Sequence, residues 1–297
     1  FFCNKMYMIQ TIVLSGGANV GFIYLGILKS LFEKNILNWN DLNTIYATSV
    51  GTLIAVSICL QKNLDEVECY YVERPWNELY KCDLSRILWC FQNGGIFDKY
   101  VLMKTLEPLL KSNDLSLEIT LKEFYEFSKI DMHFFVTKFS DFSLCDVSHH
   151  THPSWTLIDA VYSSCSLPIM FKPEFIDGEY YIDGGVITNY PLDYSIQCGC
   201  NIDTTLGINH RQQQQFIHQP YTETSNYKLL DFIVSFVNNI WLKTRNESNA
   251  CIKHQIVVEC STLPQDIMGC ISSQEEREKL VNLGKSEGIS WADTYVE

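Results

Sequence analysis

The stretch Asn43–Leu60 constrains the fold of this chain more than any other. Its apolar start, Ile45-Tyr46, is typical of a strand end, and Thr52–Leu60 favours a buried helix. Between them lie the small residues Ala47-Thr48-Ser49-Val50-Gly51. A serine on a sharp turn between a buried strand and a buried helix is the pattern of a nucleophile elbow, usually written G-x-S-x-G. Because Ala47 stands at the first glycine position, an ordinary strand–loop–helix joint with an incidental serine is a competing interpretation.

A second connection of this kind lies near the start of the chain. Met6–Leu14 predicts a buried strand, and the residues after Gly21 predict a helix. The loop between them has glycines at positions 16, 17 and 21, a spacing that fits no dinucleotide site, and it lacks the lysine of a P-loop. Backbone N–H groups at a helix start can instead hold an anion, so Gly16-Gly17-Ala18 is a candidate oxyanion hole. A tight turn that merely requires glycine is the alternative.

Two Asp-Gly pairs occur close together further along the chain. Asp177-Gly178 lies between two short β-prone runs, where Asp-Gly predicts a tight hairpin turn. Asp183-Gly184-Gly185 ends a strand and leads into no paired strand. A carboxylate there can project into a cleft with little steric obstruction. We therefore expect Asp177 to be structural and Asp183 to be a candidate base.

The segment of about 61–130 is expected to be a largely helical insertion, which either covers the site or only packs beside it. Its predicted helices are Leu64–Glu73, Leu84–Cys90, Lys99–Leu110 and Leu121–Ser128, with a loop at Asn93–Gly95. Further strands are predicted at Asp131–Phe139, Asn201–Ile208 and His254–Cys260, and further helices at Trp155–Ser163, Tyr227–Lys243 and Glu275–Leu283. With no repeat and no linker, one α/β domain is expected over residues 1–297, with its motif-bearing core at 9–191 and residues 192–297 completing it.

Charge excludes some partners. The net charge is −13, so nucleic acid is not expected as a ligand, and neither is simple electrostatic adsorption to anionic lipid. Any membrane contact would have to be apolar or use a local patch. No apolar run reaches the roughly 18–20 residues that a membrane span needs. The first ten residues do not resemble a signal peptide, and the expected location is the cytoplasm, with peripheral membrane association allowed.

Cysteine and histidine patterns were considered as metal sites. The 12 cysteines include no C-x-x-C pair, which favours buried free thiols over zinc ligands. His149-His150-Thr151-His152 places three histidines in a turn setting beside Pro153. A metal site needs ligands that face a common point and a supporting acceptor, which this tract alone does not supply. The sequence therefore predicts no metal and no cofactor.

Taken together, these stretches resemble the patatin-like phospholipase family, which combines an S-G-G-G-x-R/K-G loop, a G-x-S-x-G elbow and a late D-G-G/A motif. Here the corresponding segments are Ser15–Gly21, Ala47–Gly51 and Asp183-Gly184-Gly185, in that order. Leu167–Pro173 and Asn189-x-Pro191 are also similar to the family, so the resemblance covers about residues 9–191. The chain departs from the pattern at Ala18-Asn19-Val20 and at Ala47.

The resemblance implies a three-layer α/β domain with a central, mostly parallel sheet flanked by helices. It also implies a lipid acyl hydrolase of the phospholipase A or lysophospholipase type, independent of calcium, in which Ser49 is the nucleophile and Asp183 the base. A carboxylate within about 2.6–3.2 Å of the hydroxyl can take its proton, and no histidine is then required. The oxyanion would lie against the N–H groups of Gly16, Gly17 and Ala18. The implied partner is membrane phospholipid or lysophospholipid, and the sequence leaves open whether a protein activator takes part.

Two other interpretations stay open at this point. One is an esterase with a Ser–Asp–His triad in that chain order, using His210, His218 or His254. The other is a lipid-binding or scaffold protein that keeps the fold with weak or no turnover, because its oxyanion loop departs from the family pattern.

Overall fold

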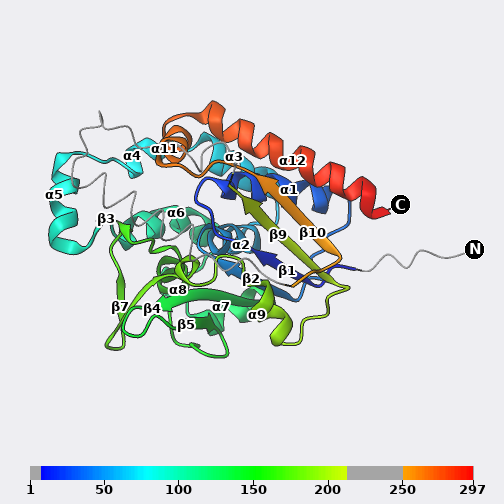
Figure 1. The fold of residues 1–297 in the computed structure, drawn as a ribbon, viewed down its shortest axis with the longest axis horizontal. Coiled ribbons are helices and arrows are strands. Elements are labelled where there is room, and N and C mark those ends of the chain that lie inside the picture. Colours follow the sequence, from blue (N-terminus) through cyan, green and yellow to red (C-terminus); the bar gives the residue numbers. More distant parts are fainter. Residues whose placement is uncertain (1–7, 213–249, 297) are drawn as a thin grey trace, which may run out of the picture.

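The computed structural model describes residues 8–212 and 250–296 (Figure 1). Within these residues, eight strands form one sheet in the order β10-β9-β1-β2-β4-β8-β7, with β5 paired to β4. The five strands from β10 to β4 run parallel, whereas β8, β7 and β5 run antiparallel to their neighbours. The expectation of a central, mostly parallel sheet is confirmed.

The strands are β1 (Thr11–Leu14), β2 (Thr44–Thr48), β3 (Gly95–Phe97), β4 (Asp131–Lys138), β5 (Leu144–Ser148), β6 (Ile169–Phe171), β7 (Glu174–Ile176), β8 (Glu179–Asp183), β9 (Thr205–Arg211) and β10 (His254–Glu259). The helices are α1 (Val20–Glu33), α2 (Val50–Leu60), α3 (Leu64–Glu73), α4 (Trp76–Leu79), α5 (Leu84–Asn93), α6 (Lys99–Lys111), α7 (Leu121–Ser128), α8 (Leu157–Cys165), α9 (Leu192–Gln197), α11 (Pro264–Ser272) and α12 (Gln274–Val296), with a 3₁₀ turn at Gly184–Val186.

The central strands are buried on both faces, which explains why their middle residues are largely apolar rather than alternating between apolar and polar. Successive residues point to opposite faces: Ile12 and Leu14 of β1 lie in the larger core cluster, whereas Val13 lies in the smaller one. In β4, Phe134 and Phe135 divide between the two clusters in the same way. The larger cluster is built with most of the helices, and the smaller one includes Leu192 of α9, so the sheet is the middle of three layers.

The first and last described helices lie side by side along one flank of the molecule (Figure 1). Glycines let α1 and α12 approach closely. A Cβ added to Gly26 of α1 would lie 2.1 Å from the Val281 carbonyl oxygen, and one added to Gly284 of α12 would lie 2.0 Å from the Ile23 carbonyl oxygen. Since backbone atoms cannot move aside cheaply, this seam depends on the absence of side chains.

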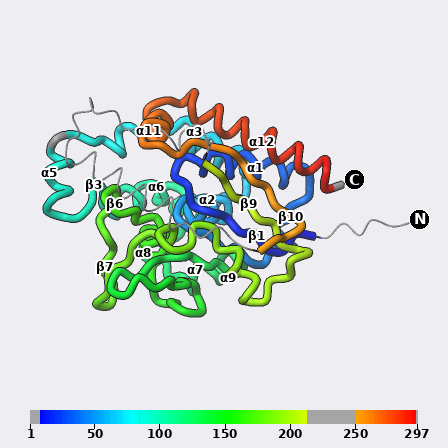
Figure 2. Tube along the Cα trace, viewed as in Figure 1, coloured from blue at the N-terminus to red at the C-terminus, as the bar shows by residue number. Residues whose placement is uncertain are grey.

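Several expected elements are confirmed almost to the residue, among them α3, α7 and β10. The tube in Figure 2 follows the segment of about 61–130, in which helices α3 to α7 are joined by loops and one short strand. The prediction of a loop at Asn93–Gly95 is wrong at Gly95. Residues Gly95–Phe97 form β3, which pairs with β6. A Cβ on Gly95 would lie 2.1 Å from the Lys172 backbone nitrogen, so the pairing requires a glycine there.

Other differences concern the second half of the chain. Strand β5 was not predicted, and α12 is much longer than the expected helix at Glu275–Leu283. The helix predicted at Tyr227–Lys243 lies outside the described residues. In the described part of the chain every cysteine is a free thiol, as expected, although four are exposed rather than buried: Cys69, Cys82, Cys198 and Cys251.

The α1–α12 seam gives a stability prediction with a matched control. Gly284→Ala adds one methyl against the Ile23 carbonyl and should lower the free energy of unfolding by about 1–3 kcal/mol. Gly269→Ala in α11 adds the same methyl where nothing lies within 4 Å, and should raise it by about 0.5–1 kcal/mol through helix propensity. Urea unfolding of both variants measures the change in the free energy of unfolding, which should be opposite in sign for the two. An equal change in both would contradict close packing of α1 against α12.

Candidate active site

Ser49 lies on the turn between β2 and α2, as the elbow pattern predicts. Its backbone has φ 54° and ψ −127°, a strained conformation for a residue with a side chain. Its neighbours must be small: a Cβ on Gly51 would lie 2.7 Å from the Ser15 carbonyl oxygen, and one on Gly16 would lie 2.9 Å from the Ser49 Cβ. The Ser49 N–H donates to the Ser164 hydroxyl at 3.0 Å, which fixes the start of the turn.

The register of the sheet brings Asp183 to the same level as Ser49. Thr48 pairs with Phe135, so Ser49 is level with Val136, and Val136 pairs on its other side with Asp183. Strands two positions apart are separated by about 9–10 Å, a gap that the elbow and the two side chains span. The Ser49 hydroxyl donates to Asp183 Oδ2 at 2.6 Å. Asp183 is only 2% exposed, so bulk water does not weaken this contact.

The Asp183 carboxylate is held by the backbone around it. Its Oδ1 accepts from the Gly185 N–H at 2.7 Å, so one oxygen is anchored and the other faces Ser49. The Asp183 carbonyl accepts from the Thr137 hydroxyl at 3.1 Å. A Cβ on Gly184 would lie 2.2 Å from the Phe135 carbonyl oxygen, which explains why glycine follows the aspartate.

Of the three backbone N–H groups expected to form the oxyanion hole, that of Gly16 already donates a hydrogen bond within the protein. The Gly16 N–H donates to the Asn189 carbonyl at 3.0 Å, and the Asn189 side-chain amide donates back to the Gly16 carbonyl at 3.2 Å. Among the described residues, no hydrogen-bond partner is found for the N–H groups of Gly17 and Ala18. Both residues have positive φ, 153° and 49°, which turns the backbone sharply before α1. The loop therefore presents two N–H groups at the start of a helix.

Of the three histidines in the triad interpretation, the structure describes His210 and His254. His210 Nδ1 lies 3.4 Å from the Ser15 hydroxyl and 3.3 Å from the Tyr24 hydroxyl, and its ring would touch a Cβ on Gly17 at 2.5 Å. His254 begins β10 and packs against Trp291 and Tyr295 of α12. His218 lies outside the described residues.

Two further residues, Asp177 and Cys165, are assigned no part in the site. Asp177, with φ 54°, forms the hairpin turn between β7 and β8 together with Gly178 and is therefore structural. Cys165, at the end of α8, is buried, and desolvation raises the pKa of its thiol well above the ordinary value. Cys165 therefore stays protonated and does not compete with Ser49 as a nucleophile.

Within residues 8–212 and 250–296, no helix combines the length and the apolar character needed to cross a bilayer.

The family model for patatin-like phospholipases matches residues 12–196. A probable lipid hydrolase of Invertebrate iridescent virus 6 is 29% identical over 202 residues, which cover 66% of each chain. Triacylglycerol lipase 4 of Saccharomyces cerevisiae is 27% identical over 228 residues, which cover 64% of this chain but only 24% of the yeast protein.

Two solved structures share the fold at low sequence identity. The structure of VipD from Legionella pneumophila has a TM-score of 0.53 at 15% identity and covers 97% of this chain and 67% of that one. The structure of the type III effector protein ExoU has a TM-score of 0.50 at 10% identity. The match covers 97% of this chain and 53% of the ExoU chain.

The family model spans the glycine loop, the elbow and the aspartate motif, which are the segments that meet in the structure. Family membership supports hydrolysis of lipid esters in general. On the match of residues 12–196 and the agreement of fold and motifs, this chain belongs to the patatin-like phospholipase family.

Proposed function

We propose that this protein is a serine-dependent lipid acyl hydrolase of the phospholipase A or lysophospholipase type, with Ser49 as nucleophile and Asp183 as general base. The observation that carries the proposal is the 2.6 Å hydrogen bond from the Ser49 hydroxyl to a buried aspartate oxygen. A serine hydroxyl is a weak nucleophile until a neighbouring base accepts its proton. Asp183 is within direct reach for that transfer, so the dyad needs no histidine.

The reaction proceeds in two halves. In the first, Asp183 takes the hydroxyl proton as Ser49 Oγ attacks the ester carbonyl. The tetrahedral adduct then collapses to an acyl-enzyme as Asp183 gives that proton to the leaving alkoxide, which departs as the alcohol. In the second, water loses a proton to Asp183 and attacks the acyl carbon. The bond from this carbon to Ser49 Oγ then breaks, which frees the fatty acid, and Asp183 returns the proton to Ser49 Oγ. Both halves pass through an oxyanion beside the helix start, where the N–H groups of Gly17 and Ala18 can stabilise it. Gly16 contributes by holding the loop through Asn189.

Peripheral contact with a phospholipid bilayer is proposed through an exposed aromatic cluster, defined here as Phe139, Phe142, Phe175 and Tyr180. These four side chains are 47–56% exposed. The Phe175 and Tyr180 rings lie 4.7 Å apart, the Phe139 and Phe142 rings 5.8 Å apart, and the Phe139 N–H joins the pairs by donating to the Tyr180 carbonyl. The cluster lies at the carboxyl end of β4, the end at which Asp183 pairs with Val136. Apolar contact suits a chain with net charge −13.

The dyad is tested by substitution with a matched control. Ser49→Ala and Asp183→Asn should each lower phospholipid hydrolysis about 10³–10⁴-fold, because each removes one half of the proton transfer. Asp177→Asn alters the other Asp-Gly pair, in a turn that asparagine tolerates, and should retain activity. Release of fatty acid from phospholipid vesicles is the measurement. Wild-type rates in either dyad variant would overturn the proposal.

A labelling experiment separates the dyad from the two other interpretations. A fluorophosphonate probe should label wild type and His210→Gln at Ser49, since the dyad alone activates the hydroxyl. Loss of labelling in folded His210→Gln would favour a triad. No labelling of folded wild type with vesicles present would favour a lipid-binding scaffold.

The oxyanion loop gives a further prediction. Gly17→Ala places a methyl against the His210 ring at a φ that side chains rarely adopt, and it should lower kcat about 10²–10³-fold. Ala18→Gly keeps the N–H and removes a Cβ from a residue with φ 49°, and it should retain activity. Hydrolysis of a water-soluble ester measures both variants. Equal losses would contradict the assignment of the donors.

The aromatic cluster is tested by vesicle binding. The double variant Phe142→Ser, Phe175→Ser should reduce partitioning onto phosphatidylcholine vesicles roughly tenfold or more, because two apolar side chains no longer enter the interface. Phe127→Ser alters a 41% exposed phenylalanine on α7, before the amino end of β4, and should bind as wild type does. Hydrolysis of a water-soluble ester should be unchanged in both variants. Unaltered vesicle binding in the double variant would contradict this surface.

A further inference from the structure

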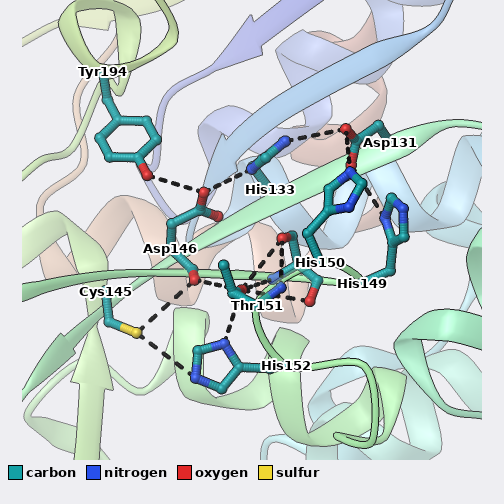
Figure 3. Close-up of polar contacts among 10 residues, drawn as sticks. Asp131, His133, Cys145, Asp146, His149, His150, Thr151, His152 and Tyr194 are labelled. Atoms are coloured by element: carbon teal, nitrogen blue, oxygen red, sulfur yellow. Dashed lines mark hydrogen bonds and ion pairs between the residues drawn. The ribbon is translucent and has the colours of Figure 1, made fainter. Parts of the chain in front are cut away.

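A cluster of histidine and aspartate side chains lies at the other end of β4 from the dyad (Figure 3). Asp131 is the first residue of β4, whereas Ser49 is level with Val136. Five residues of strand separate the two levels by roughly 16 Å. The cluster is therefore distinct from the hydrolytic site, and the proposed function makes no use of it.

Three side chains of this cluster converge on one point. One ligand atom each from Asp131, His149 and His150 lies within 4.8 Å of the other two, and this is the one such group found among the described residues. His149 Nδ1 lies 3.2 Å from Asp131 Oδ1, and His150 Nε2 lies 3.2 Å from Asp131 Oδ2. Two ligands on a tetrahedral zinc ion, each about 2.0–2.1 Å from the metal, lie roughly 3.3 Å apart. The observed separations match those of atoms that share a metal.

His150 Nε2 and Asp131 Oδ2 form a hydrogen bond, whereas His149 and Asp131 do not. His149 Nδ1 and Asp131 Oδ1 are both buried, and neither has a hydrogen-bond partner although they lie 3.2 Å apart. Buried polar atoms without a partner are costly and uncommon in folded proteins. Two atoms that are near each other but not aimed at each other are oriented as ligands toward a third atom. A cation between them would satisfy both.

Neighbouring residues hold the three side chains in place. The His149 ring stacks on Tyr125 of α7, with centroids 3.8 Å apart and planes 4° apart. On the other side of the carboxylate, His133 Nε2 lies 3.4 Å from Asp131 Oδ2, and His133 Nδ1 lies 2.7 Å from Asp146 Oδ2. Asp146 Oδ2 also accepts from the Tyr194 hydroxyl at 3.1 Å. Figure 3 shows this chain of polar contacts from Tyr194 to Asp131. Ligands oriented by such outer partners are typical of metal sites.

We propose that Asp131, His149 and His150 bind a divalent transition metal, with Zn²⁺ as the ion that best fits two imidazoles and one carboxylate. The His150 side chain is 62% exposed, so the ion can enter from solvent, and water completes its coordination. The metal ties the connection between β5 and α8 to the start of β4. It acts as a structural clip remote from the dyad.

Zinc binding by the metal-free full chain tests the proposal. Wild type dialysed against EDTA should take up one Zn²⁺ that His150→Ala does not retain, measured by calorimetric titration and by metal analysis after desalting. His150→Ala should weaken that binding roughly 10–100-fold or more. His152→Ala removes the neighbouring histidine of the same tract, which is outside the three-ligand group, and should bind as wild type does. Both variants keep all 12 cysteines, so binding to thiols cancels in the comparison.

A second readout reports on the ligands themselves. Co²⁺ added to wild type should give visible ligand-field absorption that His150→Ala and Asp131→Asn lack. His150 is exposed, so its replacement tests the site even if Asp131→Asn fails to fold. Zinc uptake that is the same in wild type and His150→Ala, or lost in His152→Ala instead, would overturn the proposal. The same holds if wild type takes up no zinc. Hydrolysis of a water-soluble ester by the metal-free chain should be unaffected, which separates this test from that of the dyad.

Discussion

The site depends on one constraint, the lateral register of three neighbouring strands. Ser49 follows β2, Asp183 ends β8, and β4 lies between them and pairs with both. A shift of either pairing by one residue would move a side chain by about 3.3 Å and turn it to the opposite face of the sheet. Because β4 is buried on both faces, such a shift would also expose core side chains. The same packing that stabilises the sheet therefore fixes the 2.6 Å contact.

Two residues of the candidate site are among the eight non-glycine residues with positive φ in the described part of the chain. Ser49 and Ala18 both have positive φ without being glycine, and Gly17 lies between Ser15 and Ala18 with φ 153°. Each strained residue costs on the order of 1–3 kcal/mol and persists only where its surroundings leave no alternative. Here the surroundings are the Ser164 hydroxyl at Ser49 and the exchange of hydrogen bonds between Gly16 and Asn189. These contacts hold Ser49 and the glycine loop in place.

The sequence predicted those parts of the fold and of the candidate site that local patterns encode. The elbow at Ser49, the strand end at Asp183 and the hairpin at Asp177 each follow from neighbours within a few residues. The use of the Gly16 N–H by Asn189 was not predictable in this way, because those residues meet only through the tertiary fold. For the same reason the His149-His150 tract alone indicated no metal, since Asp131 joins it from an earlier strand. The pairing of β3 with β6 is likewise a contact between distant segments.

The seam between α1 and α12 has a consequence for how the protein is made. The glycine loop leads directly into α1, and the face of α1 around Gly26 is covered by a helix from the far end of the described chain. During synthesis, Ser49 and Asp183 emerge long before α12 does. Until that helix docks, α1 exposes apolar surface and the loop at its start lacks a fixed support. The support of the glycine loop is therefore completed only after α12 has been synthesised and has docked on α1.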